Sequence, residues 1–303
     1  MQTNVDREII LSVIIPTCNR NNTLPRAIYS VLSQNVTGLE VIVVNDTDNP
    51  ISNEILNIAK SYPVIFVTNP GKHGAASTRN YGVSIARGTY ITFLDDDDIY
   101  LPGRLNNMLK TIKSDKYVMV SSGRIIEYDD FNIISIPKNQ LFGEISFKDV
   151  LFGNDIDIGF MISRDTFCSL GGFDTHLNSL EDWDFILRAL SDGGAYKLKK
   201  FDYVVNRTTG FTRVSDRESE GYIQLSEKWR DRTSLSWLAF MISTSLRLAK
   251  KLTFISTLKL SLKFASIIPA FFKIVVAQSC FKQPLFAPAR VSRAAPDLAS
   301  RHR

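Results

Sequence analysis

The sequence has few cysteines and no long uncharged hydrophobic run. Cys18, Cys168 and Cys280 are odd in number and far apart, which argues against a disulfide framework or a zinc cluster and predicts reduced thiols in a cytoplasmic protein. The longest uncharged run of the hydrophobic C-terminal part, residues 233–246, has fourteen residues. A membrane-spanning helix needs roughly 18–20. Residues 1–8 are polar, so we expect no cleaved secretory signal.

Charge is distributed unevenly along the chain. Residues 231–303 contain twelve Lys and Arg and two acidic residues, which gives this part a net charge of +10. Because the whole chain has a net charge of +5, residues 1–230 have a net charge of −5. Hydrophobic side chains dominate residues 233–282, with Lys and Arg between them and an interruption at Pro269. This pattern predicts one or two amphipathic helices at a membrane surface. The alternative is a helical cap packed on the rest of the protein.

Apolar runs alternate with amphipathic stretches over the first 120 residues. This alternation predicts a mainly parallel sheet with helices on both faces, in which ligands bind beyond the carboxyl ends of the strands. Shorter strands are expected over residues 118–136, and short helices over 147–152 and 164–170. The other strands are expected at residues 11–15, 41–44, 64–67 and 90–94, and the other helices at 24–33, 51–60, 75–86 and 181–191.

Four consecutive acids, residues 95–98, follow the apolar run that ends at Leu94. Adjacent carboxylates repel one another, so the cluster must be solvated or neutralised by a cation. Mg²⁺ and Mn²⁺ favour oxygen ligands and often take one or two carboxylates together with substrate phosphates. The alternative is a solvated acidic turn before the helix expected near Pro102.

Two other groups are expected on the same edge of the sheet. Asp46 ends a predicted strand and can accept hydrogen bonds from a nucleobase or a ribose, although an Asx turn with Asn45 and Asp48 would also explain it. Arg79 follows the Gly-containing helix entry at residues 69–74, where Arg79 or Lys72 could face a phosphate. A helix start with a surface arginine is the other interpretation.

Glu181 and Asp182 open the helix predicted over residues 181–191. Acidic side chains in the first turn are favoured by the helix dipole alone. The functional interpretation is that one of these carboxylates deprotonates an acceptor hydroxyl, helped by neighbouring acids that raise its pKa.

Six short segments resemble, in their order and spacing along the chain, the signature of the family 2 glycosyltransferases, and the resemblance covers residues 10–210. In two places the sequence differs from that signature. Residues 45–48 read Asn-Asp-Thr-Asp where the family often has Asp-Asp-Gly-Ser, and Asp96 replaces a small residue, which leaves the metal ligand open between Asp95 and Asp97. The matching segments are residues 12–20, 43–46, 76–82, 88–98, 171–174 and 181–188.

The resemblance implies a GT-A fold, a donor that is usually UDP-linked, Mn²⁺ or Mg²⁺, and inversion at the anomeric carbon. Residues 1–230 would form the catalytic domain, with a nucleotide-binding half (1–120) and an acceptor half (121–230). A membrane-associated segment (231–286) and a disordered tail (287–303) would follow. By position, Pro16, Thr17 and Asp46 would contact the nucleoside, Arg79 the base or phosphates, and Asp96 the ribose, while Asp95 and Asp97 would hold the metal and Asp182 would be the general base.

We therefore expect a metal-dependent glycosyltransferase that uses a nucleotide sugar and a glycan or polyprenyl-diphosphate-linked acceptor. Its setting would be surface-polysaccharide (O-antigen) synthesis at the inner face of the cytoplasmic membrane, without nucleic acid. A nucleotidyltransferase is the enzyme alternative, but it would ordinarily have a Gly-rich loop after the first strand, where residues 16–20 contain no glycine. An inactive membrane-surface module that binds sugar nucleotides and a retaining transferase are further alternatives.

Overall fold

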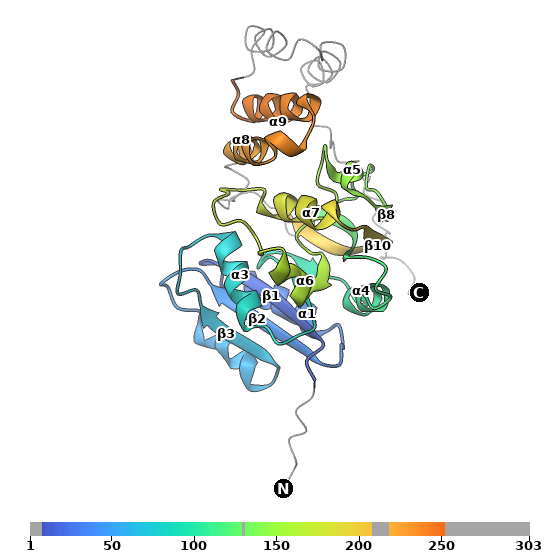
Figure 1. Cartoon of the computed structure of the whole chain (residues 1–303). Helices are drawn as coiled ribbons and strands as arrows, with labels where there is room; N and C mark the ends of the chain where they lie inside the picture. The colour runs from blue at the N-terminus through green and yellow to red at the C-terminus, as the bar shows by residue number, and fades with distance from the viewer. Residues whose placement is uncertain (1–7, 129–130, 208–217, 252–303) are drawn as a thin grey trace, which may run out of the picture.

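The computed structural model describes residues 8–128, 131–207 and 218–251 of the protein (Figure 1). Within them, strands and helices alternate over the first half of the chain, as the sequence predicts. The strands are β1 (Leu11–Thr17), β2 (Leu39–Asn45), β3 (Val64–Thr68), β4 (Tyr90–Phe93), β5 (Ile99–Tyr100), β6 (Met119–Tyr128), β7 (Ile133–Ser135), β8 (Gly143–Ile145), β9 (Met161–Ser163) and β10 (Ala195–Asn206).

These strands form one ten-stranded sheet with the order β3-β2-β1-β4-β9-β6-β10-β5, to which β7 adds beside β6 and β8 beside β10. Strand β1 lies between β2 and β4 and runs parallel to both. The second half is mixed, because β9 runs antiparallel to its neighbours β4 and β6, whereas β6 and β10 are parallel. Strands from both predicted halves of the catalytic domain therefore share a single sheet.

Helices cover both faces of the sheet, so the predicted α/β fold is confirmed (Figure 1). Two predicted extents are wrong. The helix expected over residues 51–60 is broken into a short α-helix and a 3₁₀ turn, and the short strands expected from residue 118 include the ten-residue β6, which its long pairing with β10 extends. The helices are α1 (Leu24–Leu32), α2 (Asn53–Leu56), η1 (Asn57–Lys60), α3 (Ala75–Ile85), α4 (Arg104–Ile112), α5 (Phe147–Val150), α6 (Arg164–Ser169), α7 (Glu181–Ser191), α8 (Glu218–Lys228), η3 (Arg230–Arg232) and α9 (Leu235–Leu248).

Helix α3 approaches the sheet closely because residue 82 is glycine. A Cβ atom at Gly82 would lie 2.5 Å from Cγ2 of Ile14 in β1 and 3.1 Å from Cγ2 of Val44 in β2. Arg79 precedes Gly82 by three residues and so lies on the same side of the helix. The close packing of α3 therefore places Arg79, which is 5% exposed, near the sheet and buries its side chain.

Helix α9, the first part of the hydrophobic C-terminal region, packs against the sheet domain. The fully buried Trp237 donates from Nε1 to the carbonyl oxygen of Leu151 at 2.6 Å, and Phe240 meets Phe152 edge to face. Helix α8 lies beside α9 at the end of the described structure opposite β3 (Figure 1). None of the helices in the described part of the chain is long and apolar enough to span a membrane. Residues 252–286 of the predicted membrane segment, and the predicted tail 287–303, lie outside that part.

Candidate active site

The site residues predicted for the nucleotide come from the carboxyl ends of adjacent parallel strands. Thr17 is the last residue of β1, Asp46 follows β2, and the four acids follow β4. The backbone N–H of Asp46 donates to the carbonyl oxygen of Thr17 at 2.8 Å, which ties the ends of β1 and β2 together. The fold thus places Pro16, Thr17, Asp46 and the acid run on one edge of the sheet.

Asp96 and Asp97 share one guanidinium group. Arg20 approaches Oδ1 of Asp96 at 3.0 Å and Oδ2 of Asp97 at 2.8 Å, and the Thr17 hydroxyl donates to Oδ2 of Asp96 at 2.7 Å. Burial raises the pKa of Asp96 to about 6, although Arg20 and Thr17 favour its charged form. The repulsion expected within the acid run is therefore relieved in part by a protein cation. The predicted contact of Asp96 with a ribose stays a prediction.

Asp98 differs from the other three acids in its hydrogen-bond partners, which lie on β10. Its Oδ2 accepts the hydroxyl hydrogen bond of Tyr203 at 2.6 Å, and its Oδ1 accepts from the backbone N–H of Asn206 at 2.9 Å. Burial, followed by the charges of Asp95 and Asp97, raises its pKa well above the ordinary value. Asp98 therefore connects the end of β4 to β10.

Arg79 links the acid run to helix α7. Its Nη2 lies 2.6 Å from Oδ1 of Asp95, and its Nη1 lies 2.7 Å from Oε1 of Glu181. The side chain of Asp95 is 37% exposed, whereas that of Glu181 is 10% exposed. Both ends of the guanidinium group are thus occupied by carboxylates. The predicted contact of Arg79 with the nucleotide stays a prediction.

Asp182, the predicted general base, follows Glu181 in the first turn of α7 and is partly exposed. Its Oδ1 accepts from the backbone N–H of Trp183 at 2.7 Å, and its Oδ2 accepts from Nδ2 of Asn154 at 2.9 Å. The residue before the pair, Leu180, has a φ of 63°, a strained conformation for a leucine. Strained backbone conformations of this kind cluster at functional sites, which is consistent with a functional role for the N-terminal end of α7.

The surroundings of Asp182 favour its protonated form near neutral pH. Burial, followed by the adjacent charge of Glu181, raises the pKa of this carboxyl to about 7. The Trp183 N–H and the Arg79 charge oppose the shift. A carboxylate with a pKa near the working pH is well suited to accept a proton.

Asp46 organises the loop that leads into α3. Its Oδ2 accepts from the backbone N–H of Gly74 at 2.8 Å, and its Oδ1 accepts from Nδ2 of Asn69 at 3.0 Å. Nδ1 of His73 lies 3.2 Å from the same oxygen. In place of the Asx turn considered from the sequence, Asp46 bonds the loop at residues 69–74. A role in nucleoside binding stays a prediction.

Three contributing side chains received no role from the sequence. Arg20 was visible only as the end of the first matching segment, and Glu181 only as half of an acidic pair. Asn154 follows a glycine in a loop without any decisive pattern. Its contact with Asp182 joins residues 28 positions apart and depends on the tertiary fold.

The donor set fits a hard divalent cation only in part. Among residues 8–128, 131–207 and 218–251, no group of three or more His, Cys, Asp or Glu side chains is placed to hold a metal ion. Asp95 and Asp97 offer carboxylate oxygens, and each is paired with an arginine. Mg²⁺ is commonly held by one or two carboxylates and completed by substrate phosphates. The residues therefore fit an ion that is bound together with a diphosphate.

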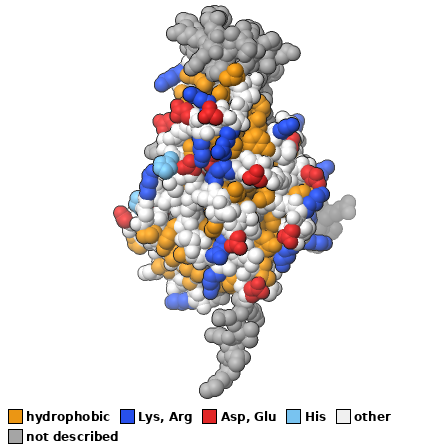
Figure 2. Space-filling view, viewed as in Figure 1, with side chains coloured by type: hydrophobic (Ala, Val, Ile, Leu, Met, Phe, Trp, Pro, Cys, Tyr) orange, Lys and Arg blue, Asp and Glu red, His pale blue; other side chains and the backbone are white. Residues whose placement is uncertain are grey.

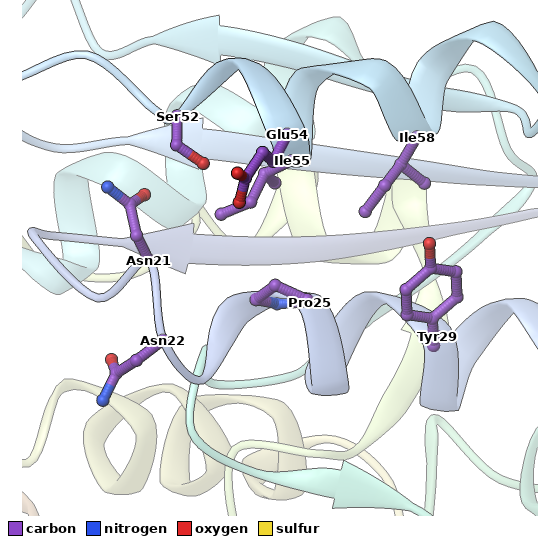
Figure 3. A pocket seen from close by; sticks show the side chains of 8 residues that line it. All are labelled: Asn21, Asn22, Pro25, Tyr29, Ser52, Glu54, Ile55 and Ile58. Carbon is purple, nitrogen blue, oxygen red and sulfur yellow. The ribbon is translucent and has the colours of Figure 1, made fainter.

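A hollow of about 450 Å³ lies between α1 and the α2–η1 segment (Figure 3). It contains none of the predicted site residues. The lining side chains are Asn21, Asn22, Pro25, Tyr29, Ser52, Glu54, Ile55 and Ile58.

Comparison with known proteins gives consistent relationships. The chain is 29% identical over 246 residues to an uncharacterised glycosyltransferase of Haemophilus influenzae. The aligned region covers 73% of this chain and 80% of the relative. It is 32% identical over 120 residues to the Escherichia coli protein named UDP-Glc:alpha-D-GlcNAc-diphosphoundecaprenol beta-1,3-glucosyltransferase WfaP, covering 40% of this chain and 48% of the relative.

The fold also matches a solved structure. Residues 1–349 of Staphylococcus aureus TarS, in complex with UDP-GlcNAc, superpose with a TM-score of 0.62 at 16% identity, over 88% of this chain and 81% of that chain. At this identity the likeness concerns the fold alone, and it agrees with the GT-A fold expected from the sequence. Residues 12–168, more than half of the chain, match the profile described as Glycosyl transferase family 2. The chain therefore belongs to glycosyl transferase family 2 and is a glycosyltransferase.

Proposed function

We propose that this enzyme transfers a sugar from a UDP-sugar to a glycan or lipid-linked acceptor, with inversion at the anomeric carbon, in polysaccharide synthesis. The observation that carries the proposal is the double ion pair of Arg79. It joins Asp95, at the end of β4, to Glu181, the residue before Asp182. The predicted leaving-group side and the predicted base are thereby brought to one place.

In this mechanism the carboxylate of Asp182 accepts the proton of an acceptor hydroxyl. The hydroxyl oxygen forms a bond to the anomeric carbon while the bond from that carbon to the diphosphate oxygen breaks. The products are the glycoside and UDP, and no covalent enzyme intermediate is needed. Its position in the first turn of α7 and its two hydrogen bonds hold the Asp182 carboxylate in place for this step.

Asp95 and Asp97 would hold Mn²⁺ or Mg²⁺, which when bound supplies positive charge to the departing diphosphate. Because each of these carboxylates is paired with an arginine, Arg79 and Arg20 also place positive charge at this edge. Thr17 and Asp46 at the adjoining strand ends are proposed to contact the nucleoside.

The names of the related proteins support the proposed donor and acceptor classes. WfaP is named as a transferase that uses UDP-Glc and a diphosphoundecaprenol-linked acceptor, and the TarS structure holds UDP-GlcNAc. Family membership speaks against the nucleotidyltransferase alternative. Turnover would separate the proposal from an inactive sugar-nucleotide module, and the anomeric configuration of the product would separate inversion from retention.

UDP is expected to protect the enzyme from thermal unfolding in a metal-dependent way. At about 100 times its Kd, a ligand stabilises the folded state by about 2.7 kcal/mol, which raises the Tm of a domain of this size by several degrees. The experiment compares UDP with and without Mn²⁺ in the wild type, in Asp97→Ala and in the exposed control Asp192→Ala. Asp97→Ala should lose the Mn²⁺-dependent part of the shift. Full retention of that part would reject Asp97 as a metal ligand.

We further propose that the C-terminal segment places the enzyme on the inner face of the membrane. Leu235 and Leu248 of α9 are 52% and 37% exposed, and hydrophobic side chains reach the surface around α8 and α9 (Figure 2). Because α9 itself packs on the domain, the proposal rests mainly on residues 252–303, which carry eight Lys and Arg against one acid. Each basic residue near an anionic surface contributes about 1 kcal/mol to membrane binding.

Removal of residues 252–303 is therefore expected to reduce binding to anionic vesicles at least tenfold in a sedimentation assay. Cleavage after Lys251 keeps α9 and its buried Trp237, so the remaining domain should stay folded, as judged by its UDP-dependent Tm. A full-length variant with Lys259→Ala and Lys263→Ala should show an intermediate loss. Equal vesicle binding by all three proteins would remove the basis for the membrane proposal.

A further inference from the structure

The carboxylate of Asp182 is held from two sides by donors of different origin. The backbone N–H of Trp183 belongs to its own helix and reaches Oδ1 at 2.7 Å. The amide of Asn154 comes from the loop between α5 and β9 and reaches Oδ2 at 2.9 Å. Each carboxylate oxygen can accept two hydrogen bonds, so both oxygens keep acceptor capacity for a substrate hydroxyl.

The orientation of the Asn154 amide is fixed by a second hydrogen bond. Its Oδ1 accepts from the backbone N–H of Ile156 at 3.1 Å. Because only the oxygen end of the amide can accept this bond, the NH₂ end must point to Asp182. The direction of donation therefore follows from the chemistry of both partners.

Buried ion pairs anchor the loop that carries Asn154. Lys197 of β10, which is fully buried, donates from Nζ to Oδ2 of Asp155 at 3.0 Å and also bonds the carbonyl oxygen of Asp155. Arg124 of β6 lies 2.7 Å from Oδ1 of Asp157 and 3.4 Å from Oδ1 of Asp155. Two strands of the sheet thus hold the loop, which makes Asn154 a rigid support for a side chain on α7.

We propose that Asn154 is a positioning residue of the transfer reaction: its amide fixes the Asp182 carboxylate in the orientation that accepts the acceptor's proton. This inference rests on the proposed role of Asp182 as the base. The amide does not touch either substrate in this role and acts only through Asp182.

Charged and titratable groups from several elements surround this pair. Glu181 lies on the same helix, Arg79 comes from α3, and Asp157 comes from the anchored loop, and the charges of all three act on Asp182. Tyr222 of α8 packs edge to face on Trp183, and the charge of Asp182 contributes to its raised pKa. Among these described neighbours, Asn154 is the neutral side chain that donates a hydrogen bond to the Asp182 carboxylate.

The test is the pH profile of kcat in two variants at saturating donor. In Asn154→Ala the carboxylate loses a donor that favours its charged form, so the acid limb should move up by about one pH unit and kcat at pH 7 should fall about fivefold. Asn154→Asp keeps the size and the acceptor for Ile156 but faces Asp182 with a second carboxylate. Its acid limb should move further, with a loss of about 100-fold at pH 7. The KM for the donor should stay within about twofold in both, because Asn154 lies in the acceptor half.

Asn57→Ala, an exposed asparagine of η1 with no side-chain hydrogen bond among the described residues, is the matched control and should keep the wild-type profile. UDP-dependent Tm shifts verify that each variant is folded. A wild-type acid limb in folded Asn154→Asp, or a lower kcat with an unmoved limb, would overturn the inference, and an inactive Asp182→Asn would still support Asp182 as the base. Full activity in Asp182→Asn would instead reject the proposed function's base.

Discussion

Asp182→Asn is expected to lower kcat by about 100- to 10,000-fold, the usual contribution of a positioned general base. The amide is isosteric with the carboxylate and can still accept from the Trp183 N–H, but it cannot take the proton of the acceptor hydroxyl. Donor binding should change little, because Asp182 lies on α7 and not at the strand ends. The measurement is the steady-state transfer rate with saturating donor, together with UDP binding. Transfer within about threefold of wild type would show that another group is the base.

The same carboxyl sets the expected pH dependence of the wild-type enzyme. Burial and the adjacent Glu181 raise the pKa of Asp182 to about 7, and only the ionised form can accept a proton. Below that pH the rate should fall about tenfold per pH unit, and above it the rate should reach a plateau. Asp182→Asn should lose this limb from its residual activity.

Stability gives an independent control for this substitution. Because the folded-state pKa lies above the ordinary value of 3.8, the folded protein holds this proton more tightly than the unfolded chain does. The resulting stabilisation is complete below about pH 4 and is lost as the pH rises through about 7. Asp182→Asn should therefore be at least as stable as wild type at pH 8, and its advantage should shrink at pH 5. Asp192→Asn, an exposed acid just beyond the same helix, should change neither activity nor this balance.

Arg79→Ala is expected to reduce the free energy of unfolding by about 3–5 kcal/mol, the loss typical of removing one partner from a buried charge pair. Arg79 is 5% exposed, and its removal leaves Asp95 and Glu181 without their shared cation. Transfer activity should also fall, because Glu181 and the neighbouring Asp182 lose their link to the acid run. Urea unfolding and the transfer assay on the same preparations measure both effects.

Two further variants test whether the loss of stability in Arg79→Ala comes from its two ion pairs. Arg79→Met with Glu181→Gln removes one of the two carboxylates that would be left uncompensated, so it should recover part of the lost stability. Arg230→Ala, at an exposed arginine that forms no ion pair within the described part of the chain, should change stability by no more than about 0.5 kcal/mol. A loss below about 1 kcal/mol in Arg79→Ala would mean that the double ion pair does not hold α7 to the sheet.

Much of the fold could be predicted from local pattern. Parallel strands buried on both faces appear as short apolar runs, and β1, β2, β3 and β4 each fall within two residues of their predicted ends. The helix α7 was also predicted at residues 181–191. The length of β6 was missed, because it depends on pairing with β10, whose residues lie 76 to 79 positions later in the chain. Local hydrophobicity contains no information about such a partner.

Part of the candidate site could likewise be predicted from the sequence, and part could not. The sequence placed acids at the ends of adjacent strands, and the sheet does bring Thr17, Asp46 and the acid run to one edge. It did not show that Asp98 turns inward to Tyr203, 105 residues away, or that Asp96 and Asp97 share Arg20. The direction in which each of four adjacent acids points depends on which cations and donors the folded chain supplies around them.

The sequence by itself determined the family, the strand-and-helix alternation and the residues that end each strand, because these depend on neighbours along the chain. Only the tertiary structure decided which charges meet. Arg79 pairs with Glu181 across 102 residues because Gly82 lets α3 approach the sheet while α7 begins above the same edge. Asn154 reaches Asp182 because Lys197 and Arg124 of β10 and β6 anchor its loop. Contacts of this kind depend on how separate elements pack, and no local pattern encodes them.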